Sequence, residues 1–267
     1  MLYKIGVMSK LLGISPEGLR LYERRGMIRA IKDEETGIRY YQPLDITALI
    51  RCRSYRRYGF TMNETADLMN AADIDYVIGQ YKQREEAIRK GIEWDIQMLS
   101  YLKSIRRVVE SIEGDYEKCR IEECPSMYRF VYMENGELVL NDDTMEKFSN
   151  WMERVPFSAL SIIWDRDLFM KGETSFRAAL CVPVEYAKAV GHCLGDPVEY
   201  LPPRKCVYTL SSEDSNRFDT ESCMGYARAY IQKKKLTLTD DPYCRTFLST
   251  DHLGNYTRWR QVWFPIE

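Results

Sequence analysis

Residues 71–113 contain no proline, and apolar side chains recur through them at alternating spacings of three and four. This spacing is typical of one face of an α-helix. About forty residues rising 1.5 Å each would make a helix roughly 60 Å long. A helix of that length separates the parts of the chain before and after it. The apolar positions are Ile74, Ile78, Tyr81, Ile88, Ile92, Leu99, Leu102 and Val109, and polar residues interrupt the pattern at Glu85, Asp95 and Arg106.

The apolar stripe of this helix needs a partner surface. A second copy of the chain would cover it in a coiled coil, and we expect a homodimer of this kind. The alternative is an ordinary long helix packed against its own chain. Residues 110–117, which include Gly114, predict a hinge. We therefore expect three parts: residues 1–73, a dimerisation helix with its hinge over 74–117, and residues 118–267.

Charge is distributed unevenly among these parts. The chain is 45% apolar and 29% charged, which excludes global disorder, and its net charge is only −2. Residues 1–60, however, hold twelve Lys and Arg against six Asp and Glu, whereas residues 118–267 hold nineteen against twenty-two. A basic N-terminal module suits contact with phosphate. Uneven surface charge without function is the alternative.

Two further features concern the cellular setting. The sequence has no run of about 18 apolar residues and no N-terminal signal pattern, so we expect a cytoplasmic protein without a membrane partner. Eight cysteines occur without CxxC spacing, which predicts mostly free thiols in a reducing compartment.

Residues 1–70 show four helical patterns with a β-wing between the second and the third. The first covers 5–12, and the second starts at Ser15-Pro16, where Ser suits a cap and Pro the first turn, and ends at Gly26. Residues 30–41 resemble two short strands around a polar turn. Further helices are predicted over 43–58 and from a capping box at Thr61 and Glu64 to residue 70. Two helices joined by a short glycine-containing turn form a helix-turn-helix.

This region resembles the winged helix-turn-helix of MerR-family transcription regulators. The similarity lies in the segments 3–6, 19–28, 37–41 and 58–61, in order and at the family's spacing. Two small departures are Leu21-Tyr22, where two aromatic residues are usual, and Gly18, where a better helix former is usual.

The resemblance implies that the protein binds double-stranded promoter DNA. Arg20 and Tyr22, with Arg24 nearby, would enter the major groove, and Arg39 and Tyr41 on the wing would touch the backbone or the minor groove. A core role for Tyr22 is the alternative. The family also implies an antiparallel two-helix dimer on a pseudo-palindromic site, and an activator that distorts the promoter so that RNA polymerase can use it.

Residues 118–267 alternate between strand and helix patterns. Strands are predicted over 127–133, 138–140, 158–164, 175–182, 205–210, 244–248 and 259–264, and helices over 144–154, 185–192 and within 216–235. Residues 180–185 and 262–267 match at an offset of 82. This offset predicts two βαββ repeats in one antiparallel sheet. The expected fold class is therefore α+β: a winged helix-turn-helix, a long dimerisation helix and this antiparallel-sheet domain.

This part resembles the GyrI-like effector-binding domain, and the whole chain resembles the multidrug-sensing, BmrR-like subgroup of the MerR family. That resemblance implies a groove between the repeats for small aromatic or lipophilic effectors, often cations. The candidate lining is Tyr132, Trp151, Trp164, Tyr208, Tyr226, Phe247, Gln261 and Trp263, and hydrophobic core is the alternative for each aromatic residue.

The predicted groove departs from the family in its charge. The family places a Glu two residues before an aromatic on the last two strands, and the corresponding residues here are Arg245 and Gln261. We therefore expect neutral or anionic ligands to be preferred over lipophilic cations, unless Glu185 or Asp165 restores an acid.

Two other functions compete with effector sensing. Cys119 and Cys124 would serve a soft-metal sensor, and Glu185 with Tyr208 would activate water in a hydrolase. The other cysteines, 181, 193, 206, 223 and 244, are interpreted as buried apolar residues. We expect no catalytic residue, no metal site and no cofactor.

Overall fold

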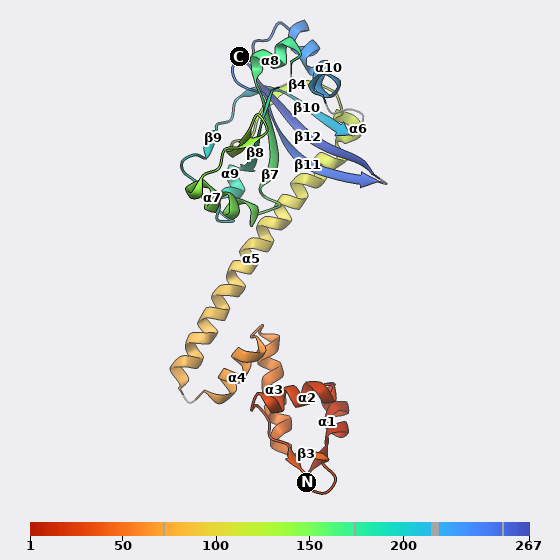
Figure 1. Ribbon diagram of the computed structural model, residues 1–267, viewed down its shortest axis with the longest axis vertical. Coiled ribbons are helices and arrows are strands. Elements are labelled where there is room, and N and C mark those ends of the chain that lie inside the picture. The colour runs from red at the N-terminus through yellow and green to blue at the C-terminus, as the bar shows by residue number, and fades with distance from the viewer. Residues whose placement is uncertain (72, 174, 215–218, 253) are drawn as a thin grey trace. The chain divides into compact units, whose positions relative to one another are not determined.

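The computed structural model describes residues 1–71, 73–173, 175–214, 219–252 and 254–267 (Figure 1). It confirms the predicted fold class, with a helix-turn-helix, a long helix and an antiparallel sheet in that order. The chain divides into two compact units, Met1–Ile92 and Glu93–Glu267. The three-part division at residues 73 and 117 stays a prediction. None of the helices in the described ranges combines the length and the apolar character needed to cross a bilayer.

The first unit contains the helix-turn-helix and its wing. Ser15 caps the second helix by accepting the amide of Gly18 at 3.0 Å, and Thr61 forms the predicted capping box with Glu64. The wing strands pair in the order β1-β3-β2. The elements are β1 (Tyr3–Lys4), α1 (Ile5–Leu12), α2 (Pro16–Arg24), β2 (Ile31–Lys32), β3 (Arg39–Tyr41), α3 (Pro43–Arg57) and α4 (Met62–Asn70).

The long helix α5 spans Ile74–Glu110 and is followed by the short helix α6, Ile112–Asp115. It ends before residue 113, where the sequence pattern placed its end. In the first unit, Tyr81 makes an edge contact with Phe60, and Arg84 donates to the carbonyl of Tyr58 at 2.6 Å. Gly59 has φ +91, a backbone conformation that side chains of L-residues rarely adopt, so this turn favours glycine.

The second unit is built on a nine-stranded antiparallel sheet. The strand order is β4-β10-β12-β11-β7-β8-β5-β6, and β9 pairs with β5. The strands are β4 (Arg120–Glu123), β5 (Met127–Glu134), β6 (Glu137–Leu138), β7 (Ala159–Trp164), β8 (Phe176–Pro183), β9 (Glu199–Leu201), β10 (Lys205–Asp214), β11 (Tyr243–His252) and β12 (Asn255–Pro265). The helices are α7 (Asp142–Met152), α8 (Arg166–Lys171), α9 (Val184–Ala187) and α10 (Thr220–Lys233).

The two predicted βαββ repeats are confirmed. The first is β5-α7-β7-β8 and the second is β10-α10-β11-β12, and the offset of 82 superimposes their elements in the sequence. They join where β11 pairs with β7, with Tyr243 opposite Ile163. The sequence patterns did not predict α6, α8, β4 or β9, which are three to six residues long.

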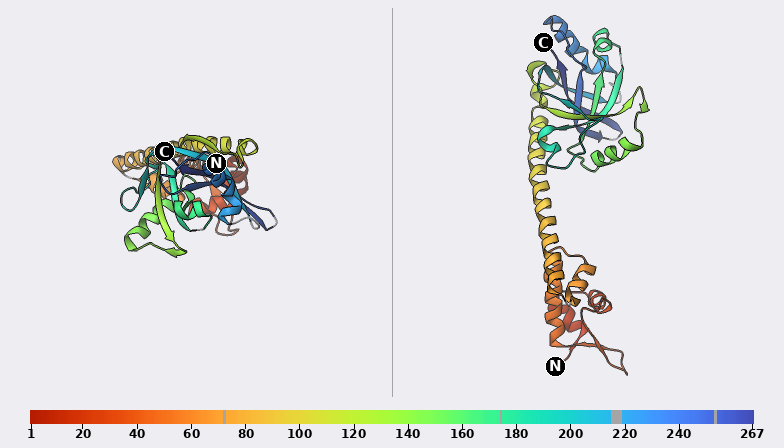
Figure 2. Two further views of the ribbon diagram at one scale, coloured as in Figure 1. Left: turned by 90° about the horizontal axis from the view of Figure 1, so that it is seen from above. Right: turned by 90° about the vertical axis from the view of Figure 1, so that its left-hand side faces the viewer.

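Helices cover one face of the sheet. Helices α8 and α10 lie over the second repeat, and α7 and α9 lie over the first (Figure 2). The opposite face, which we call the open face, carries a separate buried cluster that includes Ala179, Tyr208, Tyr243 and Trp263. The last turns of α5 and α6 pack against the open face through Val108 and Ile112.

Candidate functional site

Helix α2 presents two arginines to solvent. Leu19 is fully buried and fixes the helix on the core of the first unit. Arg20 and Arg24 are exposed, and both bind the carboxylate of Glu17, at 3.0 and 3.2 Å. Their hydrogen bonds lower the pKa of Glu17. Both guanidinium groups are therefore available to a stronger anion such as a DNA phosphate.

The other three predicted DNA-contacting residues lie closer to the core. Arg39 on the wing is partly buried and donates to Glu23 of α2 at 3.1 Å, which ties the wing to that helix. Tyr41 is fully buried in the core of the first unit, and its hydroxyl has no hydrogen-bond partner among the described residues. Tyr22 is partly buried between two hydrophobic clusters. The two tyrosines thus occupy positions that suit core aromatic residues.

Further exposed basic residues surround α2. Arg25 follows the helix, and Arg29 and Lys32 lie at the start of the wing. The sequence patterns assigned no role to Arg29 or Lys32. The signal that could have found Lys32 is its position in the wing, where β2 pairs it with Arg39 of β3.

A cleft of about 290 Å³ opens on the open face of the second unit, beside the last turns of α5. Three of the predicted effector-binding residues, Tyr208, Gln261 and Trp263, line it together. The other lining residues are Arg107, Val108, Ser111, Asp115, Arg120, Glu122, Pro125 and Arg245.

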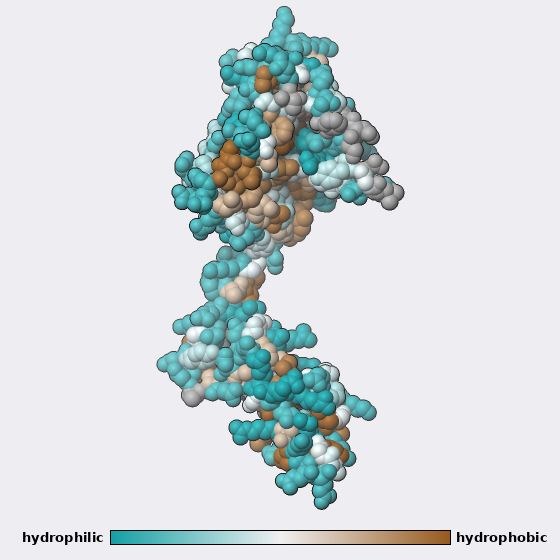
Figure 3. Space-filling view, viewed as in Figure 1, coloured by the Kyte–Doolittle hydropathy of each residue, from teal (hydrophilic) through white to brown (hydrophobic). Residues whose placement is uncertain are grey.

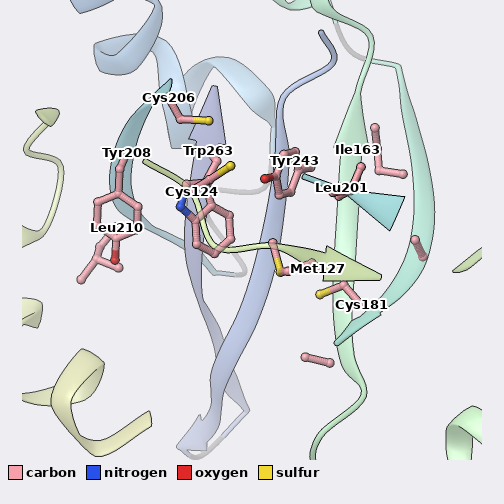
Figure 4. Close-up of a cluster of buried hydrophobic side chains, with 12 residues drawn as sticks. Cys124, Met127, Ile163, Cys181, Leu201, Cys206, Tyr208, Leu210, Tyr243 and Trp263 are labelled. Atoms are coloured by element: carbon pink, nitrogen blue, oxygen red, sulfur yellow. The ribbon is translucent and has the colours of Figure 1, made fainter. Parts of the chain in front are cut away.

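Strand register brings the cleft residues together. Tyr208 of β10 lies opposite Trp263 of β12, which lies opposite Tyr243 of β11, so the three side chains share the open face (Figure 4). Trp263 stacks on Tyr243 with ring centroids 5.5 Å apart, and its ring is tilted against Tyr208 at 5.8 Å. Gln261 donates its amide hydrogen to the Tyr208 hydroxyl at 3.2 Å.

The structure does not bring the other five candidates to this cleft. Tyr132 and Trp151 pack in the cluster under α7, where Trp151 donates its indole hydrogen to the carbonyl of Cys193. Trp164 and Tyr226 pack in the cluster under α10. Phe247 borders a separate hollow beside α5. The sequence could not separate these residues from the cleft residues, because alternation in a strand assigns side chains to two faces without showing which face the helices cover.

The cleft has a mixed set of charges. Arg120 bridges Asp115 at 2.8 Å and Glu122 at 2.7 Å, and its guanidinium lies 4.4 Å from the centroid of the Tyr208 ring. Arg245 lies on the floor and is only 7% exposed. The resemblance to the family treated Arg245 only as the loss of an acid and did not predict that it lines the cleft. The sequence signal for this position is the spacing of Tyr243, Arg245 and Phe247, which are two residues apart on one strand and so point to the same face.

The acids that the sequence offered as replacements lie elsewhere. Glu185 is exposed at the start of α9, and Asp165 caps α8 by accepting the amide of Leu168. Neither lines the cleft. Glu185 also lies on the opposite side of the sheet from Tyr208, so the pair proposed for a hydrolase is not assembled.

Cys119 and Cys124 do not lie together, as the alternative of a soft-metal sensor would require. Cys119 packs in the cluster under α10, whereas Cys124 lies in the cluster of the open face together with Cys206. Within the described ranges, no three His, Cys, Asp or Glu side chains gather as a metal site would require. No disulfide joins cysteines within the described ranges. The prediction that Cys193 is buried was wrong, because the loop after α9 leaves it exposed.

Comparisons with known proteins place the first unit in a family. Residues 3–72 match the model of the MerR HTH family regulatory protein. The mercuric resistance operon regulatory protein of Shigella flexneri is 33% identical over 69 residues, which are 26% of this chain and 48% of that relative. An uncharacterised HTH-type transcriptional regulator of Pseudomonas aeruginosa is 28% identical over 130 residues, or 45% of this chain and 90% of the relative.

The chain spans about half the length of the mercuric resistance relatives that it matches. Among solved structures, that of the EcmrR–DNA complex is similar over 99% of both chains, with 16% identity and a TM-score of 0.37. The family match coincides with the segment that contains α1, α2, the wing, α3 and α4. The N-terminal domain of this chain therefore belongs to the MerR family of helix-turn-helix regulators.

Proposed function

We propose that this protein is a ligand-responsive transcription regulator. In this proposal the MerR-type domain binds double-stranded promoter DNA, and a small aromatic or lipophilic effector occupies the cleft of the second unit. Effector binding changes the geometry of the promoter that RNA polymerase reads. The observation that carries the proposal is the exposed pair Arg20 and Arg24 on α2 of a MerR-family domain.

The apolar surface of α5 supports a homodimer. Trp94, Met98 and Ile105 turn toward the second unit and pack against its core. On the opposite side of the helix Ile88, Ile92, Ile96 and Leu99 remain 44%, 54%, 59% and 55% exposed. Figure 3 shows that other apolar surface, coloured brown, gathers on the second unit. These four residues, which we call the α5 stripe, recur at spacings of four, four and three. A second copy of the helix is the surface that such a stripe fits.

Neither competing function has a comparable geometric basis. A thiol-based metal sensor needs converging ligands, and Cys119 and Cys124 lie in clusters on opposite faces of the sheet. A hydrolase needs an acid within reach of its substrate site, and Glu185 lies outside the cleft. We propose neither.

Binding to a DNA fragment from upstream of the protein's own gene tests the proposal. Fluorescence anisotropy at low salt should show binding by the wild-type protein. Arg20→Ala and Arg24→Ala should each weaken binding about tenfold. Each should also make the slope of log K against log salt concentration shallower by about one, because the variant neutralises one phosphate fewer. Arg89→Ala is the matched control, because Arg89 is an exposed arginine of α5 that pairs with Glu86. Equally weakened binding in all three variants would argue against a specific α2 surface.

A further inference from the structure

The floor of the cleft contains buried hydrogen-bond donors that no residue in the described part of the chain satisfies. Arg245 is 7% exposed, and its Nε and Nη2 atoms are buried without a hydrogen-bond partner. Trp263 is 1% exposed, and its indole Nε1 is likewise buried and unpartnered. Both residues line the same cleft. A buried donor without an acceptor is costly, so such atoms point to a bound group that accepts hydrogen bonds.

The charge of Arg245 is also not compensated by any ion pair within the described ranges. Among the described residues, the carboxylates of the cleft are Asp115 and Glu122, and Arg120 binds both. Arg245 forms no ion pair with any carboxylate in the described ranges. It lies instead over the ring of Tyr101, with its Cζ 5.1 Å from the ring centroid. Among the described residues, the Arg245 guanidinium therefore has a ring face beside it and no paired carboxylate, an environment that favours the binding of an anion.

The walls of the cleft suit a flat apolar body. The rings of Tyr208 and Trp263 lie side by side on the open face, with an angle of 50° between their planes, and both residues line the cleft. Val108 of α5 faces the same space. The volume of about 290 Å³ is sufficient for a ligand of one or two fused rings.

Resting on the proposed role of the cleft as the effector site, we propose that its ligand is an aromatic carboxylate. The carboxylate accepts hydrogen bonds from the Arg245 guanidinium and from Trp263 Nε1, and the ring lies against Tyr208 and Trp263. Arginine binds a carboxylate through two parallel N–H donors, which gives both charge and orientation. A lipophilic cation would be repelled by Arg245 and would leave the indole donor unsatisfied.

Isothermal titration calorimetry on the full-length protein, without DNA, tests this assignment. The probes are benzoate, 2-naphthoate, the neutral isostere 2-naphthamide and the cation 2-naphthylmethylammonium. We expect 2-naphthoate to bind about tenfold or more tightly than 2-naphthamide, and the cation to be weakest. Arg245→Met should remove the preference for the carboxylate. Arg245→Lys should retain part of it, because lysine supplies the positive charge without the paired, coplanar N–H donors of a guanidinium.

Thermal unfolding without ligand separates a binding role from a structural one. Arg245→Met replaces an unpaired buried cation with an apolar side chain, so its melting temperature should equal or exceed that of the wild type. Arg106→Met is the matched control, because Arg106 is exposed, pairs with Glu110 and lies outside the cleft. That variant should bind 2-naphthoate as the wild type does.

Each outcome of these titrations has one interpretation. Failure of both carboxylates to bind, tighter binding of the cation, or unchanged carboxylate preference in Arg245→Met would overturn the anion site. A large drop in melting temperature in Arg245→Met would assign Arg245 to the core instead. If 2-naphthoate binds through Arg245 but the DNA complex is unchanged by it in the anisotropy assay, the anion site stands and the proposed regulatory function fails.

Discussion

Among individual residues, His192 has the environment with the clearest consequence for stability. The ring is buried in an edge contact with Trp151, with centroids 4.9 Å apart, and its Nε2 lies 2.8 Å from the hydroxyl of Ser158. That hydroxyl already donates to the carbonyl of Trp151, so the histidine is the donor at Nε2. Burial, which disfavours the charged form, lowers the pKa of His192 to about 4.

We predict that His192 makes the second unit less stable in mild acid. The unfolded chain binds a proton at an ordinary pKa near 6.5, whereas the folded chain does so only near 4. Stability should therefore fall as the pH drops from about 6.5 to about 4, and this residue should account for about 2 kcal/mol at pH 5. Urea unfolding at pH 7 and pH 5 measures the effect.

The other histidine of the chain supplies the control. His192→Gln should lose less stability between the two pH values than the wild type, by about 2 kcal/mol. His252→Gln should behave as the wild type, because His252 is exposed on β11. Equal pH dependence in all three proteins would show that folding does not change the pKa of His192.

Gly18 shows what a local pattern omits. In the sequence it stands out as a poor helix former inside α2. In the structure its amide donates to the Ser15 cap, and a Cβ there would lie 2.8 Å from Cγ2 of Ile14. The close approach of the Ile14 side chain, from the turn just before α2, favours glycine here, and helix propensity does not include this contact.

Among the elements, α5 shows how far periodicity can predict a structure. The pattern predicted a long helix and one apolar stripe. The structure contains the helix but two apolar faces, because Trp94, Met98 and Ile105 pack inward while the α5 stripe remains exposed. Ile96, which the sequence pattern passed over, belongs to the exposed face. An apolar helix face predicts burial but does not show which surface covers it. The face formed by Trp94, Met98 and Ile105 could therefore be assigned only from the folded sheet domain.

We predict that the α5 stripe holds the proposed dimer together. Ile96→Asp and Leu99→Asp should each place a charge in the apolar seam and shift the protein toward monomer at micromolar concentration, without loss of helix content. Sedimentation velocity and circular dichroism measure the two properties.

Lys90→Asp provides the comparison for this experiment. Lys90 is exposed on the side of α5 that turns away from the stripe, and its weak pair with Glu86 spans 3.9 Å. This variant should sediment as the wild type does. If all three variants remain dimeric, another surface holds the two copies together.

For the molecule as a whole, the hydrophobic clusters separate into two sets. Those formed around Leu19, Cys52 and Tyr55 lie in the first unit, and those formed around Trp263, Phe264 and Trp151 lie in the second. The sequence predicted the helix-turn-helix and the two repeats well, because both have strong local signals. It placed only three of eight effector candidates in one cleft, since register and face depend on pairings between distant strands.

We predict that the two units unfold in separate transitions. Thr61 and Asn141 are N-cap residues of matching capping boxes, on α4 in the first unit and on α7 in the second. Replacing either with alanine should cost about 1 kcal/mol. Differential scanning calorimetry should show Thr61→Ala lowering only one transition, by roughly 4–8 °C, and Asn141→Ala lowering only the other, by roughly 2–4 °C. A single transition shifted by both variants would show that the units unfold together.

The internal duplication has a consequence for how the cleft arose. Three cleft residues on β11 and β12 have counterparts 82 positions earlier: Ile163 for Arg245, Ala179 for Gln261 and Cys181 for Trp263. All three counterparts are buried small or apolar side chains. After an internal duplication, the second repeat would have been free to acquire a binding site while the first repeat kept a structural role. The proposed effector site would then belong to the second repeat alone, although both repeats share one fold.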